Sequence, residues 1–279
     1  MLEFTKMHGL GNDFIVVNNL EGLYNPSEMA EKAPALCHRN FGIGADGLVL
    51  LNRSEVAPFR MQIFNPDGSE AEMCGNAIRC LGKYVWEQKM IVDNRVTFET
   101  GAGIKDVTLQ VEDGKVESVR VNMGQPILES DRVPVDGPSR HAVNEAITAC
   151  ERDFEFTAVG MGNPHCVIFL DSLENLPWEK WGAALENHPL FPKRTNVEFV
   201  EITGPGEIRV KVWERGAGPT LACGTGACAS TVAGIITGRL KESVDVHLPG
   251  GTLHIQWKEG GPVYMEGPAE EVFNGEIFL

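Results

Sequence analysis

The sequence predicts an α+β protein of two pseudo-symmetric domains, each a barrel-like β-sheet wrapped round one central helix. Three observations predict this fold class: many short strand signals, two strongly apolar helix signals and an internal repeat. The chain has 279 residues, of which 43% are hydrophobic, so it can bury the cores of two medium domains. Its 31 glycines and 16 prolines favour many turns over long helices.

Short runs of β-branched and aromatic residues bounded by turn residues predict the strands. We expect strands at Phe14–Val17, Leu48–Leu51, Met61–Asn65, Val96–Thr100, Lys105–Val111, Val116–Met123, Glu155–Val159, Cys166–Leu170, Asn196–Ile202, Glu207–Trp213, Val244–His247, Thr252–Trp257, Val263–Glu266 and Glu276–Leu279.

Few segments have a helical pattern. Ser27–Cys37 and Val143–Cys150 are modestly amphipathic, and Trp178–Glu186 is short. Gly75–Gln88 and Gly224–Thr237 are longer and apolar nearly all round, which is typical of buried helices. We therefore expect one sheet to surround each of these two helices.

The internal repeat indicates a duplication. Gly9–Asn12 returns as Gly160–Asn163, and Met73–Ala77 returns as Ala222–Gly226. Each copy of the first motif precedes an apolar strand, and each copy of the second opens an apolar helix. The period is too long for a solenoid, so it predicts two similar domains.

The offset of the second motif also relates two other pairs. Asn65 lies nine residues before Cys74 as Glu214 lies nine before Cys223, and Gly47 falls opposite Asn196. We expect residues 1–123 to form the first domain, completed by the last strand at about 264–279, and residues 124–263 to form the second.

Charge and cysteine content narrow the functional classes. The net charge of −15 disfavours nucleic acid or anionic lipid as a partner. Met1–Lys6 has no signal-peptide pattern, and no run reaches the roughly 20 apolar residues that span a bilayer.

Seven cysteines without a CxxC pair favour neither a secreted disulfide framework nor a zinc site. We expect a reduced, cytoplasmic protein with no metal.

Cys74 and Cys223 are the most informative residues, because each opens a helix and is followed by glycine. The free N–H groups and dipole of a helix N-terminus lower the pKa of a thiol and also bind carboxylates. Either cysteine alone reads as a structural thiol, but the duplication places the two at corresponding positions. Pseudo-symmetry would bring them face to face across a cleft between the domains.

Two facing acid/base groups are what a cofactor-independent racemase or epimerase needs. One group removes the Cα proton, and the other returns a proton to the opposite face. A thiol suits this role because its pKa lies near neutrality. No cofactor is then required.

Together these motifs resemble diaminopimelate epimerase. The residues that carry the resemblance are Lys6–Phe14, Phe64–Ser69, Met73–Cys80, Gly162–Cys166, Trp213–Gly216 and Ala222–Gly226. The resemblance implies conversion of LL- to meso-2,6-diaminopimelate in lysine and peptidoglycan precursor biosynthesis, without pyridoxal phosphate or metal. It also makes a homodimer plausible.

The resemblance also implies residue roles. Cys74 and Cys223 match the family's catalytic thiols, and His165 and Glu214 match groups that adjust thiol pKa values. The positions that match substrate-binding groups are Asn12, Asn65, Gly75, Asn76, Asn163, Asn196, Glu214, Arg215, Gly224 and Thr225. One departure is Gly47, where many members have glutamine, so we leave it out of the site.

The residue chemistry agrees with these roles. The guanidinium of Arg215 suits a distal carboxylate, and Glu214 can accept an ammonium group. The glycine pattern Gly42–Gly47 does not predict a dinucleotide site, because the strand Leu48–Leu51 follows it instead of a helix. The alternatives are another amino-acid racemase, similar to proline racemase, and a thiol redox protein.

Overall fold

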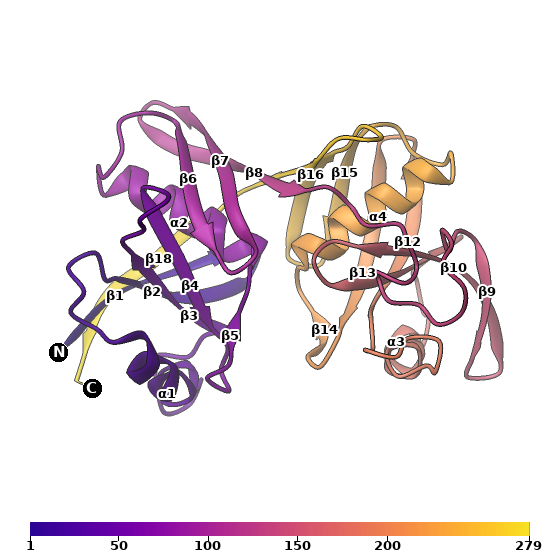
Figure 1. The fold of residues 1–279 in the computed structure, drawn as a ribbon, viewed down its shortest axis with the longest axis horizontal. Coiled ribbons are helices and arrows are strands. Elements are labelled where there is room, and N and C mark those ends of the chain that lie inside the picture. The colour runs from indigo at the N-terminus through magenta and orange to yellow at the C-terminus, as the bar shows by residue number, and fades with distance from the viewer. Residues whose placement is uncertain (279) are drawn as a thin grey trace. The chain divides into compact units, whose positions relative to one another are not determined.

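The computed structural model describes residues 1–278 and divides them into two compact units (Figure 1). Unit 1 contains Met1–Asn122 together with the described residues from Glu266 onward, and unit 2 contains Met123–Met265. Both are rich in strands and poor in helices, as an α+β fold requires.

Unit 1 is built on one mixed sheet. Its strands are β1 (Leu2–Gly9), β2 (Asn12–Asn18), β3 (Gly47–Asn52), β4 (Phe59–Phe64), β5 (Glu70–Ala71), β6 (Arg95–Thr100), β7 (Gly103–Glu112), β8 (Lys115–Gly124) and β18 (Glu270–Ile277). β18, β1 and β2 are antiparallel, and β3 runs parallel to β2. β4 is antiparallel to β3 and β5 but parallel to β6, which leads through the antiparallel strands β7 and β8.

Unit 2 repeats this pairing pattern. Its strands are β9 (Glu145–Ala149), β10 (Arg152–Gly160), β11 (Pro164–Leu170), β12 (Asn196–Gly204), β13 (Glu207–Glu214), β14 (Gly218–Thr220), β15 (Ser243–Leu248) and β16 (Gly251–Gln256), and β17 (Val263–Gly267) follows them. β10 and β11 are antiparallel, β12 is parallel to β11, β13 is antiparallel to β12, and β15 is parallel to β13. The strands β1 to β7 therefore correspond to β10 to β16, as the internal repeat predicts.

One buried helix lies against each sheet. α2 (Gly75–Glu87) packs on β1, β2, β4, β7 and β18, and α4 (Gly224–Ile236) packs on β10 to β13, β15 and β16. Most residues of both helices are buried. The two apolar helix predictions are confirmed, and so is the prediction of one central helix for each sheet.

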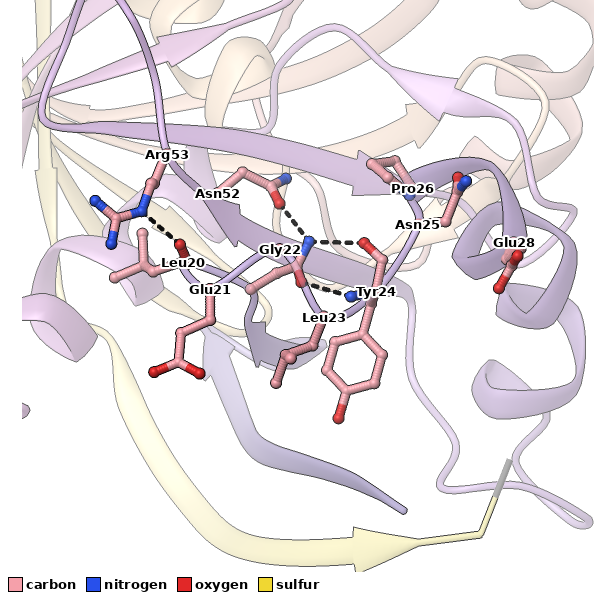
Figure 2. A pocket seen from close by; sticks show the side chains of 11 residues that line it. Leu20, Glu21, Gly22, Leu23, Tyr24, Asn25, Pro26, Glu28, Asn52 and Arg53 are labelled. Carbon is pink, nitrogen blue, oxygen red and sulfur yellow. Dashed lines mark hydrogen bonds between the residues drawn. The ribbon is translucent and has the colours of Figure 1, made fainter.

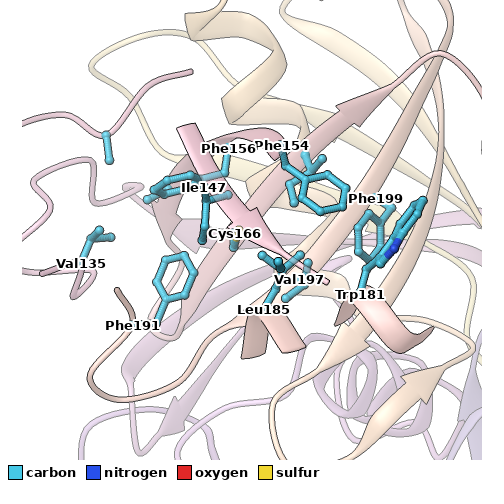
Figure 3. Packing of buried hydrophobic residues seen from close by; sticks show 14 of the residues in the cluster. Val135, Ile147, Phe154, Phe156, Cys166, Trp181, Leu185, Phe191, Val197 and Phe199 are labelled. Atoms are coloured by element: carbon cyan, nitrogen blue, oxygen red, sulfur yellow. The ribbon is translucent and has the colours of Figure 1, made fainter. Parts of the chain in front are cut away.

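A second, amphipathic helix covers another part of each sheet. α1 (Pro26–Cys37) buries Met29, Ala33 and Leu36 in unit 1. In unit 2, α3 (Trp178–Glu186) packs Trp181 and Leu185 into an aromatic core (Figure 3). The cluster in Figure 3 includes Phe154, Phe156, Cys166, Phe191, Val197 and Phe199.

Alternation along the strands divides the side chains of unit 2 between two faces. Val197 and Phe199 of β12 belong to the core that α3 covers. The intervening residue, Glu198, therefore points to the opposite face, where α4 contacts β12. The same alternation on β11 separates Cys166, in the α3 core, from His165.

Most expected elements are present, but Val143–Cys150 is wrongly predicted as a helix. Glu145–Ala149 is instead β9, which pairs with β10. Cys150 and Glu151 form the turn between these two strands, with φ values of 53° and 61°. A two-residue turn with both residues in the left-handed region forms a tight hairpin, and it gives no sequence signal here because neither residue is glycine or asparagine.

The remaining differences are at the ends of the chain and in short strands. β1, β5 and β14 are strands that we did not predict. The expected strand Glu276–Leu279 overlaps only the end of β18, and Leu279 lies outside the described residues.

Candidate active site

Cys74 is the N-cap of α2 in unit 1, and its side chain is partly buried. Its Sγ lies 3.8 Å from Oδ1 of Asn12, to which the thiol can donate. The same oxygen accepts a hydrogen bond of 2.9 Å from Nδ2 of Asn76. Three of the predicted site residues therefore meet at the start of this helix.

An ionic network holds Asn12 in place. Its Nδ2 donates to Oδ2 of Asp46 at 2.8 Å, and Arg39 bridges Asp46 and Asp13 at 2.6 and 2.7 Å. Burial alone would raise the pKa of Asp13, but hydrogen bonds from Arg39 and Lys6 outweigh it and lower the pKa to about 2. Because Asp46 can only accept, the amide oxygen of Asn12 is left to face Cys74 and Asn76.

Arg79, one turn into α2, places a buried positive charge beside the first turn of this helix. Its side chain is 0% exposed and donates to the carbonyl of Gly75 at 3.1 Å, to Oδ1 of Asn76 at 2.8 Å and to the carbonyl of Pro268 at 3.2 Å. The repeat places Cys228 at the equivalent position of unit 2. Arg79 belongs to the sequence motif Met73–Cys80, but we did not predict a role for its side chain.

Asn65 follows β4 and is tied into a turn, where its Nδ2 donates to Oγ of Ser69 at 2.9 Å. Gly47 begins β3, and an added Cβ there would lie 3.2 Å from the carbonyl oxygen of Phe64. A side chain at position 47 would therefore crowd the end of β4. Glycine at this position, in place of the glutamine that the family resemblance leads us to expect, fits this packing.

Cys223 is the N-cap of α4 in unit 2 and is 5% exposed. Its Sγ accepts a hydrogen bond of 3.3 Å from the backbone N–H of Gly226 and lies 3.4 Å from Oγ1 of Thr225. Gly224 begins α4 as Gly75 begins α2. Both thiols thus lie at helix N-termini, as predicted.

The expected lowering of the thiol pKa is wrong for Cys223. Burial raises its pKa well above the ordinary value, the carboxyl groups of Glu214 and Glu198 raise it further, and hydrogen bonds from Thr225 and Gly226 oppose this only in part. The helix N-terminus therefore does not outweigh desolvation and two nearby carboxyl groups. Cys223 is a neutral thiol at neutral pH.

Hydrogen bonds join Asn163 and His165 to this thiol. Nδ2 of Asn163 donates to Oγ1 of Thr225 at 3.3 Å, and its Oδ1 lies 2.8 Å from Nε2 of His165. Nδ1 of His165 lies 2.7 Å from Oε1 of Glu198, and both side chains are 0% exposed. Glu198 was not predicted, because a single acidic residue inside an apolar strand has no motif.

Glu214 lies at the end of β13, where its Oε1 accepts a hydrogen bond of 2.5 Å from the hydroxyl of Thr220. Burial raises the pKa of Glu214, although the Thr220 hydrogen bond and His165 oppose the shift. A carboxylate in this environment gains from binding a cation such as an ammonium group.

Asn196 and Arg215 lie together in unit 2. Oδ1 of Asn196 accepts a hydrogen bond of 2.9 Å from the backbone N–H of Arg215, and its Nδ2 donates to the carbonyl of Pro164 at 2.8 Å. The exposed guanidinium of Arg215 donates to the carbonyl of Lys193 at 3.1 Å. Its remaining N–H groups can bind an anion.

The predicted site residues therefore form two sets, one at the start of each central helix. The set of unit 1 comprises Asn12, Asn65, Cys74, Gly75 and Asn76. The set of unit 2 comprises Asn163, His165, Asn196, Glu214, Arg215, Cys223, Gly224 and Thr225. The structure adds Asp46 and Arg79 to the first set and Glu198 to the second.

None of these residues lines the pocket of unit 1 drawn in Figure 2, which is formed by Asn19–Pro26, Glu28, Asn52 and Arg53. Asn19 holds this loop closed by donating to the carbonyl of Tyr24 at 2.9 Å and to Oδ1 of Asn52 at 2.7 Å. The pocket results from the packing of this loop, and none of the predicted site residues lines it.

Within residues 1–278, no cluster of three or more His, Cys, Asp or Glu side chains is arranged to hold a metal ion. Nor does that part of the chain contain a helix long and apolar enough to cross a membrane. All seven cysteines are free thiols.

Comparisons with known proteins agree over nearly the whole chain. The family model of diaminopimelate epimerase matches residues 4–129 and 157–272. The diaminopimelate epimerase of Pelotomaculum thermopropionicum is 53% identical over 275 residues, which cover 99% of this chain and 98% of the relative. That of Carboxydothermus hydrogenoformans is 54% identical over 280 residues and covers 100% of both chains.

A solved structure shares the fold at low identity. The crystal structure of a probable proline racemase from Agrobacterium radiobacter with bound carbonate has a TM-score of 0.75 at 17% identity and covers 100% of this chain and 93% of that one. At this identity the likeness shows the fold alone. The family model and the close relatives show that the chain belongs to the diaminopimelate epimerase family.

Proposed function

We propose that this chain epimerises LL-2,6-diaminopimelate to meso-2,6-diaminopimelate by a cofactor-independent, two-base mechanism that uses Cys74 and Cys223. The observation that carries the proposal is the pair of cysteines at the N-caps of α2 and α4, the corresponding helices of a duplicated fold. We infer the substrate, diaminopimelate, from the membership of this chain in the diaminopimelate epimerase family.

In this mechanism one thiolate removes the Cα proton and the other thiol protonates the opposite face. The raised pKa of Cys223 supports its role as the acid of the first half-reaction, which assigns the base to Cys74. The reverse reaction exchanges these protonation states. The substrate must then be bound with one sulfur at each face of its α-carbon.

Helix N-termini and polar side chains would hold the substrate. The backbone N–H groups at Gly75–Asn76 and Gly224–Thr225 suit the reacting α-carboxylate, because a helix N-terminus favours negative charge. We assign the distal carboxylate to Arg215 and an ammonium group to Glu214. The amides of Asn12, Asn65, Asn163 and Asn196 would complete the recognition of the substrate.

The same proposal includes a cytoplasmic location and a homodimer. Seven free thiols support a reducing compartment. Analytical ultracentrifugation of the purified protein tests the dimer: a single species at the monomer mass over the working concentration range would contradict it.

The alternatives are a proline-racemase-like activity and a thiol redox function. The test is an assay of the purified, reduced protein with LL-diaminopimelate and with L-proline, accompanied by quantitative thiol titration. We expect epimerisation of diaminopimelate only. Racemisation of proline, or reversible thiol oxidation without any epimerisation, would contradict the proposal.

A further inference from the structure

Glu198 and His165 form a buried acid–base pair close to Cys223. Both side chains are 0% exposed, and Oε1 of Glu198 lies 2.7 Å from Nδ1 of His165. Among the described residues, Oε2 of Glu198 has no hydrogen-bond partner. A carboxyl group with one oxygen buried and unsatisfied reduces stability, so its presence calls for another explanation.

The fold itself does not require this pair. In unit 1 the parallel strands β2 and β3 have the same register as β11 and β12, and they place Phe14 and Val49 at the positions of His165 and Glu198. Phe14 is 2% exposed and Val49 is 0% exposed. Because an apolar pair fills the equivalent site, the acid–base pair is specific to the unit that contains Cys223.

A continuous chain of hydrogen bonds leads from this pair to the sulfur. His165 Nε2 lies 2.8 Å from Oδ1 of Asn163, whose Nδ2 donates to Oγ1 of Thr225 at 3.3 Å. Oγ1 of Thr225 lies 3.4 Å from Sγ of Cys223.

In this series of hydrogen bonds, each donor is directed towards Sγ of Cys223. Because an amide oxygen only accepts, Nε2 of His165 must carry a hydrogen. Oγ1 of Thr225 accepts from Asn163, so its own hydrogen is available to Sγ of Cys223. The N–H of Gly226 also donates to Sγ, at 3.3 Å.

We propose that Glu198 is a positioning residue for Cys223: it holds His165 with Nε2–H directed at Asn163, and so directs the hydroxyl hydrogen of Thr225 to the sulfur. It shares one proton with Nδ1 of His165, either as carboxylate with imidazolium or as carboxylic acid with neutral imidazole. Nε2 carries a hydrogen in both forms.

This arrangement matters when Cys223 becomes a thiolate during turnover. Burial, Glu214 and Glu198 all raise the pKa of Cys223, so the thiolate depends on the donors directed at it. Glu214, Cys166 and Cys223 are the other titratable groups whose charges interact with the pair. The kinetic consequence rests on the proposed function, but the orientation of His165 does not.

Two substitutions separate position from charge. Glu198→Gln and Glu198→Val both remove the carboxylate, but only the glutamine amide can donate to Nδ1 and keep Nε2 protonated. Valine is also the residue that occupies this position in unit 1. Glu201→Gln, on the same strand, serves as the control, because Glu201 contacts Leu173 and Arg209 outside the network.

The first readout is the pH dependence of Cys223 alkylation by iodoacetamide, measured by peptide mass spectrometry, and the second is the kcat for diaminopimelate. We expect the alkylation midpoint of Glu198→Val to lie about one pH unit or more above that of Glu198→Gln. Its kcat should be about ten- to a hundredfold below that of the glutamine variant. Equal midpoints and equal kcat values in the two variants would overturn the proposal.

The imidazole ¹⁵N shifts of His165 in the unsubstituted protein give a readout that no folding defect can affect. We expect Nε2 to carry a hydrogen under the assay conditions, because it faces the amide oxygen of Asn163, and an unprotonated Nε2 would overturn the proposal. If the protein does not act on diaminopimelate, the proposed function fails. The alkylation and ¹⁵N measurements still decide the role of Glu198.

Discussion

At the scale of single residues, the two thiols have matched positions and different surroundings. Cys74 is partly buried beside the amide of Asn12, and the buried cation Arg79 donates to Gly75 and Asn76 in the first turn of its helix. Cys223 is buried close to Glu198 and Glu214, which raise its pKa. The surroundings of Cys223 favour its neutral thiol form before the first proton transfer, which suits the role of acid that we propose for it.

The sequence identified the residues that motifs carry and missed those that support them. Cys74 and Cys223, like Asn12 and Asn163, belong to repeated motifs, so the internal repeat identifies them. Asp46 and Glu198 act on Asn12 and His165 through contacts between neighbouring strands. No local pattern encodes such contacts, because they depend on strand register.

Replacing Arg215 with methionine tests the recognition of the distal carboxylate. We expect a strongly raised KM and a lower kcat, since binding energy remote from the reacting carbon helps to position it. The loss of a charge-assisted contact costs about 2–3 kcal/mol in kcat/KM. Arg209→Met is the control, because Arg209 lies on β13 before Arg215 and its exposed side chain pairs with Glu201, and it should retain normal kinetics. Near-normal kcat/KM in Arg215→Met would exclude it as a substrate ligand.

Asp13 makes an acid-sensitive contribution to stability. Its pKa is lowered from 3.8 to about 2, so its stabilisation is present above pH 4 and is lost as the pH falls towards 2. We expect Asp13→Asn to lower the urea midpoint at pH 6, and the difference from the parent protein should shrink between pH 4 and 2. Glu31→Gln, on the exposed face of α1, is the control. A difference that did not change over this range would contradict the assignment.

At the scale of elements, the central helices were predictable because apolar residues on all sides imply burial. β9 was not, because the segment Val143–Cys150 fits a helical period and its hairpin turn uses Cys150 and Glu151 in left-handed conformations. Tertiary pairing with β10 decides its conformation. Local propensity is a weak guide where a neighbouring strand supplies the hydrogen bonds.

The first turn of α4 is packed tightly around the site. A Cβ at Gly226 would lie 2.8 Å from Oε1 of Glu198 and 3.3 Å from Sγ of Cys223. We expect Gly226→Ala to displace both groups and to lower kcat by about a hundredfold, as small misplacements in active sites do.

Gly82→Ala in α2 is the matched control for this prediction. Its Cβ would meet Val107, Leu109 and Val119 at 3.1–3.2 Å, in the core of unit 1. We expect a lower Tm with normal kcat at assay temperature. Steady-state kinetics and thermal unfolding of both variants make the comparison, and equal kcat in the two variants would contradict the packing argument.

At the scale of the whole molecule, one supersecondary pattern occurs twice and its functional residues diverge. Both copies keep the glycine turn, the central helix and the N-cap cysteine. Arg79 faces Cys228 in the alignment of the repeats, and Phe14 and Val49 face His165 and Glu198. The duplication could be predicted from the sequence. The difference in charge around the two cysteines could not, because it depends on side chains that only the fold brings together.

If both thiols act on one carbon, mild oxidation should inactivate the enzyme. An added disulfide such as oxidised glutathione can take the two thiol hydrogens and leave a Cys74–Cys223 bond, because two sulfurs that act on one carbon lie near the separation that a disulfide needs. We expect activity to return with a thiol reductant, and Cys150→Ser to respond in the same way. Full activity with the mapped Cys74–Cys223 bond intact would contradict the proposed pair.

Turnover of LL-diaminopimelate in deuterated water tests the two-base mechanism most directly, with deuterium at Cα measured by mass spectrometry in product and recovered substrate at early times. We predict deuterium in the product and little in the substrate, since the abstracting thiol holds the old proton on one face while the solvent-equilibrated thiol protonates the other. Original protium in the product, together with deuterium washed into unreacted substrate, would indicate one base and contradict the pairing of Cys74 with Cys223.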